Sequence, residues 1–240
     1  MTSLLGGARI LAAKDLKVEA RAKETFPPML AFAFAVTVLL SFTLPAGSDL
    51  QAPREIPPLG TVAVADVLAG FLWVTILFAG LIGFARTFEA EREDGAIEAL
   101  LLSPVDRSAL WIAKASANLA FIAAIELFLL PLFALLFGFH LGSGWLTLIG
   151  VVALADVGFV SVGTLFASAA AQTRSKELML PILALPALVP LFLAAVELSS
   201  RLFVGAPVSD VASSGWFVIL AVYDLVVIGV ALLAYEFVID

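Results

Sequence analysis

Arg86 to Ser108, RTFEAEREDGAIEALLLSPVDRS, is the most charged stretch of an otherwise apolar chain. It holds 9 of the 33 Asp, Glu, Lys and Arg residues. Apolar runs long enough to cross a bilayer lie on both sides of it. The stretch is therefore predicted to be a water-exposed connection between two transmembrane helices.

The composition around this stretch is that of a membrane protein. Of the 240 residues, 62% are apolar and 14% are charged, and the mean hydropathy is +1.10. A soluble domain is nearer half apolar and a quarter charged. At about 20 residues for each crossing plus loops, the length suits about six crossings. The absence of cysteine excludes disulfides, thiolate zinc sites and cysteine nucleophiles.

The N-terminal region predicts a helix before the first crossing. Residues 9–24, RILAAKDLKVEARAKE, contain no Pro or Gly and are rich in helix formers. Lys14, Lys17 and Arg21 share one face, which suits contact with anionic lipid headgroups. We expect an interfacial helix within residues 1–28, the alternative being a simple solvated helix. Phe26-Pro27-Pro28 is expected to end it. No cleavable signal peptide is expected, because eight charged residues fall in the first 24 residues.

Six crossings are predicted, at Met29–Leu44, Val67–Ala85, Leu110–Phe137, Trp145–Ala171, Leu178–Val196 and Trp216–Phe237. The fold class is all-α and polytopic, with residues 1–240 forming a single domain. Residues 45–66 and 197–215 are interpreted as exterior loops, the first with a short interfacial piece near residues 59–64. Pro181, Pro186 and Pro190 predict that the fifth crossing is kinked or broken.

The distribution of Lys and Arg predicts the orientation. Eleven of these residues fall on the side of the N-terminus, and only Arg54 and Arg201 fall on the other side. Short cytoplasmic loops carry such an excess of cations. Both termini and the 86–108 segment are therefore placed in the cytoplasm.

The 86–108 segment also carries a docking edge. Acidic residues cluster before Gly95, which permits a turn, and Ile97, Leu100 and Leu101 then follow at i, i+3 and i+4. This pattern suits insertion into a groove on another protein, although an amphipathic linker lying on the membrane remains the alternative. The short connection 172–177, QTRSKE, is a candidate second contact. The predicted docking residues are Glu91, Asp94, Gly95, Ile97, Glu98, Leu100, Leu101, Arg174 and Glu177.

Three carboxyl residues, Glu126, Asp156 and Asp224, fall inside predicted crossings. Each costs about 2.5 to 3.5 kcal/mol on insertion scales. They are either polar points of a substrate or conformational pathway, or groups protonated or paired between packed helices. Glu197, at an exterior boundary, is expected to be solvated. His140 is the sole histidine and is expected at a helix end, since it cannot by itself supply two axial haem ligands.

Signatures of enzymes and of nucleic-acid binding are absent from the sequence. The chain has no Gly-rich phosphate loop with its Lys, no HExxH and no GxSxG. It has no basic patch beyond the N-terminal helix. Ser161 and Ser168 sit in small-residue stretches that suit close helix packing. A non-catalytic membrane subunit without a bound cofactor is expected.

Residues 88–104, FEAEREDGAIEALLLSP, resemble the coupling helix of ABC-2 type permeases, which docks on a cytoplasmic ATPase. The ending LLLSP, and SVGTLFASAAAQTRSKELMLPILALPALVP from Ser161 to Pro190, resemble the CcmB family of haem exporter proteins, which belongs to the cytochrome c maturation system. Ala96-Ile97 departs from the pattern, in which a hydroxyl residue and Leu are more usual.

This resemblance implies a permease subunit in the inner membrane that borrows ATP hydrolysis from a separate ATPase. It further implies haem in the pathway, a haem-handling membrane subunit, an exterior haem chaperone and a second copy of the chain. The nearest alternative is an ABC-2 permease for a lipid, glycan or drug. A different class is a proton-coupled carrier that uses Glu126 and Asp156.

Overall fold

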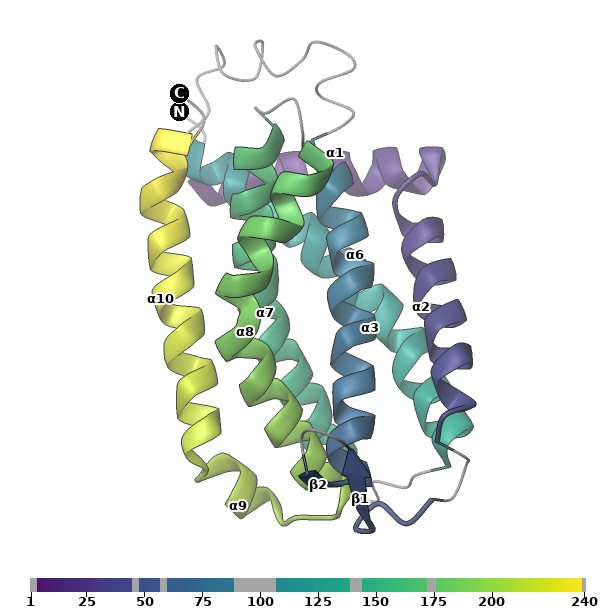
Figure 1. Ribbon diagram of the computed structural model, residues 1–240. Coiled ribbons are helices and arrows are strands. Elements are labelled where there is room, and N and C mark those ends of the chain that lie inside the picture. The colour runs from purple at the N-terminus through teal and green to yellow at the C-terminus, as the bar shows by residue number, and fades with distance from the viewer. Residues whose placement is uncertain are drawn as a thin grey trace.

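The computed structural model describes residues 4–44, 48–56, 60–88, 107–138, 144–171 and 176–238. Six helices run alongside one another as a bundle, and a seventh lies across one end of it (Figure 1). The bundle helices are α2 (Phe26–Ser41), α3 (Val64–Arg86), α6 (Arg107–Phe137), α7 (Trp145–Ala171), α8 (Lys176–Phe203) and α10 (Gly215–Val238). The helix across the end is α1 (Leu4–Ala22), and α9 (Val208–Ala212) is a short helix at the other end. The predicted all-α polytopic fold is confirmed.

Within the described ranges, five helices are long and apolar enough to cross a membrane: α3, α6, α7, α8 and α10. The α1–α2 pair, bent by 70°, makes a sixth span if it is counted as one. The 16 residues of α2 reach only about 24 Å, short of a hydrocarbon core of about 30 Å. Each predicted crossing corresponds to a helix, and α7 has the predicted bounds.

The elbow between α1 and α2 differs from the prediction that Phe26-Pro27-Pro28 ends the first helix. That prediction was wrong by about one turn, because α1 ends at Ala22 and Lys23 adopts the left-handed conformation, with φ 56°. The backbone N–H of Lys23 donates to the carbonyl of Glu19 at 2.8 Å. The prolines instead occupy the first turn of α2, where a backbone N–H is not needed.

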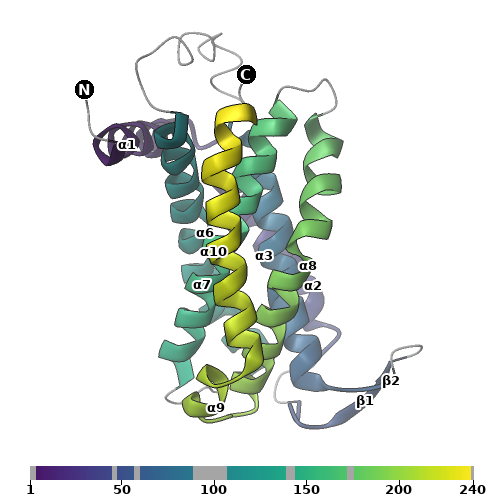
Figure 2. The ribbon, with the colours of Figure 1, turned by 90° about the vertical axis from the view of Figure 1, so that its left-hand side faces the viewer.

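The loop before α3, predicted to be exterior, contains a β-hairpin whose second strand covers most of the predicted interfacial piece near residues 59–64. Strand β1 (Pro53–Ile56) pairs antiparallel with β2 (Gly60–Ala63), with Pro53 opposite Ala63. The β-branched Thr61 and Val62 favour this extended backbone. The hairpin projects from the end of the bundle that also carries α9, opposite to α1 (Figure 2).

Helix α8 is one continuous helix, so it is not broken by its three prolines. It also continues past the predicted end at Val196 to Phe203, which shortens the second exterior loop. The hydroxyl of Tyr223 in α10 donates to the carbonyl of Ala187 at 2.7 Å, in the turn before Pro190. This side-chain contact joins α10 to the proline-containing part of α8. Glu197 forms an ion pair with Arg201 at 2.8 Å, beyond the solvation expected for it.

Close packing of small residues joins α3 to α7 in the core. A Cβ on Gly163 would lie 2.1 Å from the ring of Phe84, and one on Gly80 would lie 2.4 Å from Phe159. The two rings meet edge to face, with centroids 5.0 Å apart. The hydroxyls of Ser161 and Ser168 donate to carbonyls of their own helix, as the predicted packing role requires.

Candidate functional site

The helices that flank the predicted docking segments end at the same end of the bundle as α1 (Figure 1). Seven of the nine docking residues, from Glu91 to Leu101, lie outside the described residues, as do Arg174 and His140. Glu177 belongs to the first turn of α8, and its side chain is outside the described set. On the α3 side, the described residues therefore stop at Thr87 and Phe88, where α3 leads into the docking segment.

Lys114 joins three elements at this end. Its ammonium group lies 3.0 Å from Oδ2 of Asp15 on α1 and 5.4 Å from the centroid of the Phe88 ring. Lys114 is buried, with 6% of its side chain exposed, and Asp15 has 14% exposed. A buried ion pair of this kind holds α1 against α6, because separating it would leave a charge uncompensated. The contact also fixes the residue from which the docking segment departs.

One turn further into the bundle, Asn118 makes the next polar contact of α6. Its amide Nδ2 donates to Oγ1 of Thr164 on α7 at 3.0 Å. Its Oδ1 accepts from the hydroxyl of Thr87 at 3.2 Å. Asn118 therefore ties the end of α3 to both α6 and α7.

Eight residues beyond Asn118 on α6, and eight before Thr164 on α7, the side chains of Glu126 and Asp156 lie close enough to interact. Equal spacing on two antiparallel helices places this contact about 12 Å deeper along the same seam. Both residues are buried.

Asp224 of α10 is the third carboxyl of this group. It lies close enough to Asp156 for their charges to interact, and a Cβ on Gly158 would fall 2.1 Å from its Oδ1. Neither oxygen of Asp224 has a hydrogen-bond donor among the described residues. The structure thus brings together three carboxyl groups that are far apart in the sequence, each from a different helix.

We call the contacts of Thr87, Lys114, Asn118, Thr164, Glu126 and Asp156 the polar seam. It runs from the start of the docking segment to the interior of the bundle, along one buried side of α6. Because Asn118 and Glu126 of α6 both contact α7, a slide of α6 against α7 would disturb both contacts. The seam therefore suits transmission of a movement. Among the described residues, no three His, Cys, Asp or Glu side chains are arranged to hold a metal ion.

Sequence reasoning missed four members of the site, Asp15, Thr87, Asn118 and Thr164, and treated Lys114 only as an inside cation. A signal was present on α6, since Lys114 and Asn118 are four residues apart and therefore share a face. Their partners on α1, α3 and α7 carried no comparable signal.

Comparison with known proteins gives a consistent result along the chain. Residues 8–239 match the family described as CcmB protein. The "Heme exporter protein B" of Rhodobacter capsulatus is 30% identical over 194 residues, covering 80% of this chain and 82% of that protein. The protein of the same name from Pseudomonas aeruginosa is 29% identical over 171 residues, covering 66% of this chain and 71% of that protein. The one from Paracoccus denitrificans is 27% identical over 200 residues, covering 82% of this chain and 84% of that protein.

Proposed function

Because the chain belongs to the CcmB protein family, we propose that it is the permease subunit of a haem-exporting ABC transporter complex. In this proposal a separate cytoplasmic ATPase drives haem delivery or the release of a haem chaperone during cytochrome c maturation. The observation that carries it is the match to the family over residues 8–239. The names of the similar proteins support haem as the cargo.

The ATPase docks on the 86–108 segment, with the leucine edge of Leu100 and Leu101 in a groove and Glu91, Asp94 and Glu98 orienting the contact. Arg174 and Glu177 make the second contact. The shared position of the flanking helix ends supports a single docking surface (Figure 1). Movement of the segment then reaches Thr87 and Phe88 and passes along the polar seam to the interior carboxyl groups.

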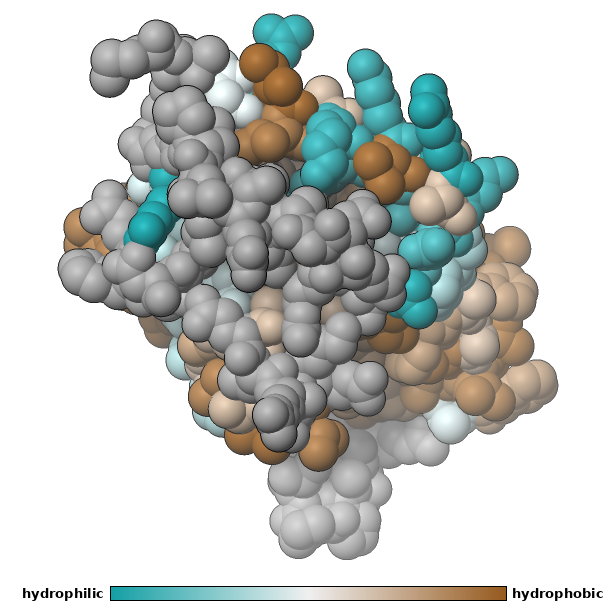
Figure 3. Space-filling view, turned by 90° about the horizontal axis from the view of Figure 1, so that it is seen from above, coloured by the Kyte–Doolittle hydropathy of each residue, from teal (hydrophilic) through white to brown (hydrophobic). Residues whose placement is uncertain are grey.

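The end that carries α1 faces the cytoplasm, and the hairpin and α9 face the exterior of the inner membrane. Hydrophilic side chains gather along one edge of the α1 end, seen from above in Figure 3. Cations at this end include Arg9, Lys17, Arg21, Arg86 and Arg107, whereas Arg201 lies at the other end of α8. This distribution follows the positive-inside rule. Two copies of the chain, a haem-handling membrane subunit and an exterior haem chaperone complete the complex.

Leu100→Asp tests the docking role. Placing a carboxylate at the centre of an apolar contact should weaken ATPase binding about 30-fold while leaving membrane insertion unchanged. Leu102→Asp is the matched control, because it adds the same charge on the opposite face of the predicted helix. ATPase copurification in mild detergent and haem transfer to an acceptor protein are the measurements. Wild-type ATPase binding by the Leu100→Asp protein would refute docking through this edge.

One observation favours a second candidate, a proton-coupled carrier, namely that two buried carboxyl groups, Glu126 and Asp156, lie close together between α6 and α7. For such a carrier, transport should persist without an ATPase, and Glu126→Gln should abolish it. For the ABC permease, transport should stop when the ATPase is removed. Copurification of a haem-handling subunit separates haem export from export of a lipid, glycan or drug.

A further inference from the structure

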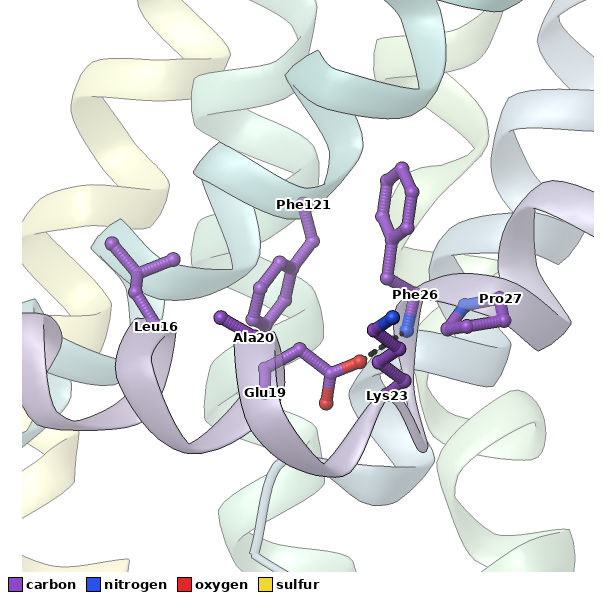
Figure 4. A pocket seen from close by; sticks show the side chains of 7 residues that line it. All are labelled: Leu16, Glu19, Ala20, Lys23, Phe26, Pro27 and Phe121. Atoms are coloured by element: carbon purple, nitrogen blue, oxygen red, sulfur yellow. Dashed lines mark hydrogen bonds between the residues drawn. The ribbon is translucent and has the colours of Figure 1, made fainter.

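An open pocket of about 290 Å³ lies at the elbow between α1 and α2 (Figure 4). Its apolar wall is formed by Leu16, Ala20, Phe26, Pro27 and Phe121, the last reaching across from α6. Glu19 and Lys23 complete the lining. We propose that this pocket binds an anionic phospholipid, with acyl chain against the apolar wall and headgroup beside Lys23.

The position of the pocket decides which molecule fills its apolar part. It opens between a helix that lies across the bundle end and the first helix of the bundle (Figures 1 and 4). A hollow with walls this apolar offers water too few hydrogen-bond partners. At the surface of a membrane protein, the neighbouring apolar molecules are lipid chains.

The charges around the elbow select an anion. The carboxylate of Glu19 is occupied, since its Oε1 accepts from the backbone N–H groups of Thr25 at 2.9 Å and Phe26 at 2.7 Å. These donors belong to the start of α2, where the helix dipole offsets the negative charge. Glu24 is exposed, but the exposed cations Lys17, Arg21 and Lys23 outnumber it.

Lys23 is held in place by its backbone. Its φ of 56° is in the left-handed region, and its N–H is bonded to the Glu19 carbonyl. The turn thus fixes the backbone of Lys23 at the pocket wall, from which its exposed side chain can reach a headgroup phosphate. The lining contains no His, Met, Cys or Tyr that would ligate haem iron.

The test uses the full chain in its purified complex with phosphatidylglycerol or phosphatidylcholine that carries a photoreactive group on one acyl chain. Crosslinks to the chain are mapped by mass spectrometry. We expect labelling at Leu16, Ala20 and Phe121, with phosphatidylglycerol captured in preference. Lys23→Asn removes the charge and tolerates positive φ, so it should reduce this preference about fivefold. Arg9→Asn, about 21 Å away along α1, is the control and should preserve the preference.

A steric variant keeps the proposal testable without reference to charge. Ala20→Trp fills the pocket and should abolish labelling there, whereas Ala13→Trp, two turns earlier on the same exposed helix, should leave it intact. Equal capture of the two lipids by the wild-type protein would overturn the proposal. Unchanged labelling in the Ala20→Trp protein would also overturn it. The same holds if all lipid-facing helices are labelled equally, or if haem displaces the lipid.

Discussion

Lys114 shows how one side chain gives a membrane protein a connection that its apolar helices cannot provide. It lies in the predicted third crossing, yet its ammonium group is satisfied by Asp15 of α1 and by the Phe88 ring. Lipid provides no hydrophobic force that would hold α1 against α6, so specific packing and polar contacts must do so. The small residues Ala8, Ala109 and Ala113 allow the two helices to approach closely enough for this ion pair.

Replacing one member of the Lys114–Asp15 ion pair should destabilise the protein. Lys114→Met is expected to lower the free energy of unfolding by about 3 kcal/mol, because it removes the buried partner of Asp15 and leaves that carboxylate only the more exposed Lys14. Lys14→Met removes the other lysine near Asp15, at 3.3 Å, but that side chain is 46% exposed, so the loss should be well under 1 kcal/mol. Denaturation of the detergent-solubilised protein measures both values. Adding Asp15→Asn to Lys114→Met should recover part of the loss; additive losses would show that the residues are not coupled.

At the scale of elements, the contact of α3 with α7 depends on glycines that leave room for rings. Gly163 faces Phe84 and Gly80 faces Phe159, so each helix supplies both a hollow and an aromatic side chain. The same two helices also reach the polar seam, through Thr87 just beyond α3 and Thr164 on α7. Packing and polar contacts therefore fix a single alignment of α3 against α7.

Gly163→Ala should disturb this alignment. The added methyl group would lie 2.1 Å from the Phe84 ring, so ring or helix must shift, at a cost of about 1 to 3 kcal/mol. Gly150→Ala makes the same change in the same helix where nothing lies within 4 Å, and it should be neutral or slightly stabilising. Thermal unfolding followed by circular dichroism compares the two. Equal melting temperatures would contradict the packing described for Gly163.

Features carried by local composition were predictable, and features that depend on tertiary contacts were not. The bounds of α7 follow from a long apolar run flanked by turn residues. The continuity of α8 could not be predicted, because tolerance of prolines inside a membrane helix depends on packing against neighbouring helices, which the local sequence does not show. Glu126, Asp156 and Asp224 were each identified as unusual, but their meeting depends on the register of three helices. The docking role of Leu100 stays a prediction.

At the scale of the whole molecule, the two ends of the bundle differ in the elements and the cations that they carry. One end carries α1, the cations and the ends of the helices that flank the docking segments. The other carries the hairpin and α9, and the polar seam starts at the first end and stops in the interior. This asymmetry fits a protein that receives a movement on one side of the membrane and presents a surface with few cations on the other.

The asymmetry makes the orientation testable in a chain that has no cysteine of its own. Single cysteines are introduced as Lys17→Cys on α1 and Ala212→Cys on α9, both at exposed positions. In intact cells whose outer membrane has been permeabilised, a membrane-impermeant maleimide should label Ala212→Cys and spare Lys17→Cys, because the proposed orientation places α1 in the cytoplasm. Disrupting the inner membrane should then make Lys17→Cys react, while the unsubstituted protein provides the unlabelled control. Labelling of Lys17→Cys alone in intact cells would reverse the orientation and remove the basis for ATPase docking at that end.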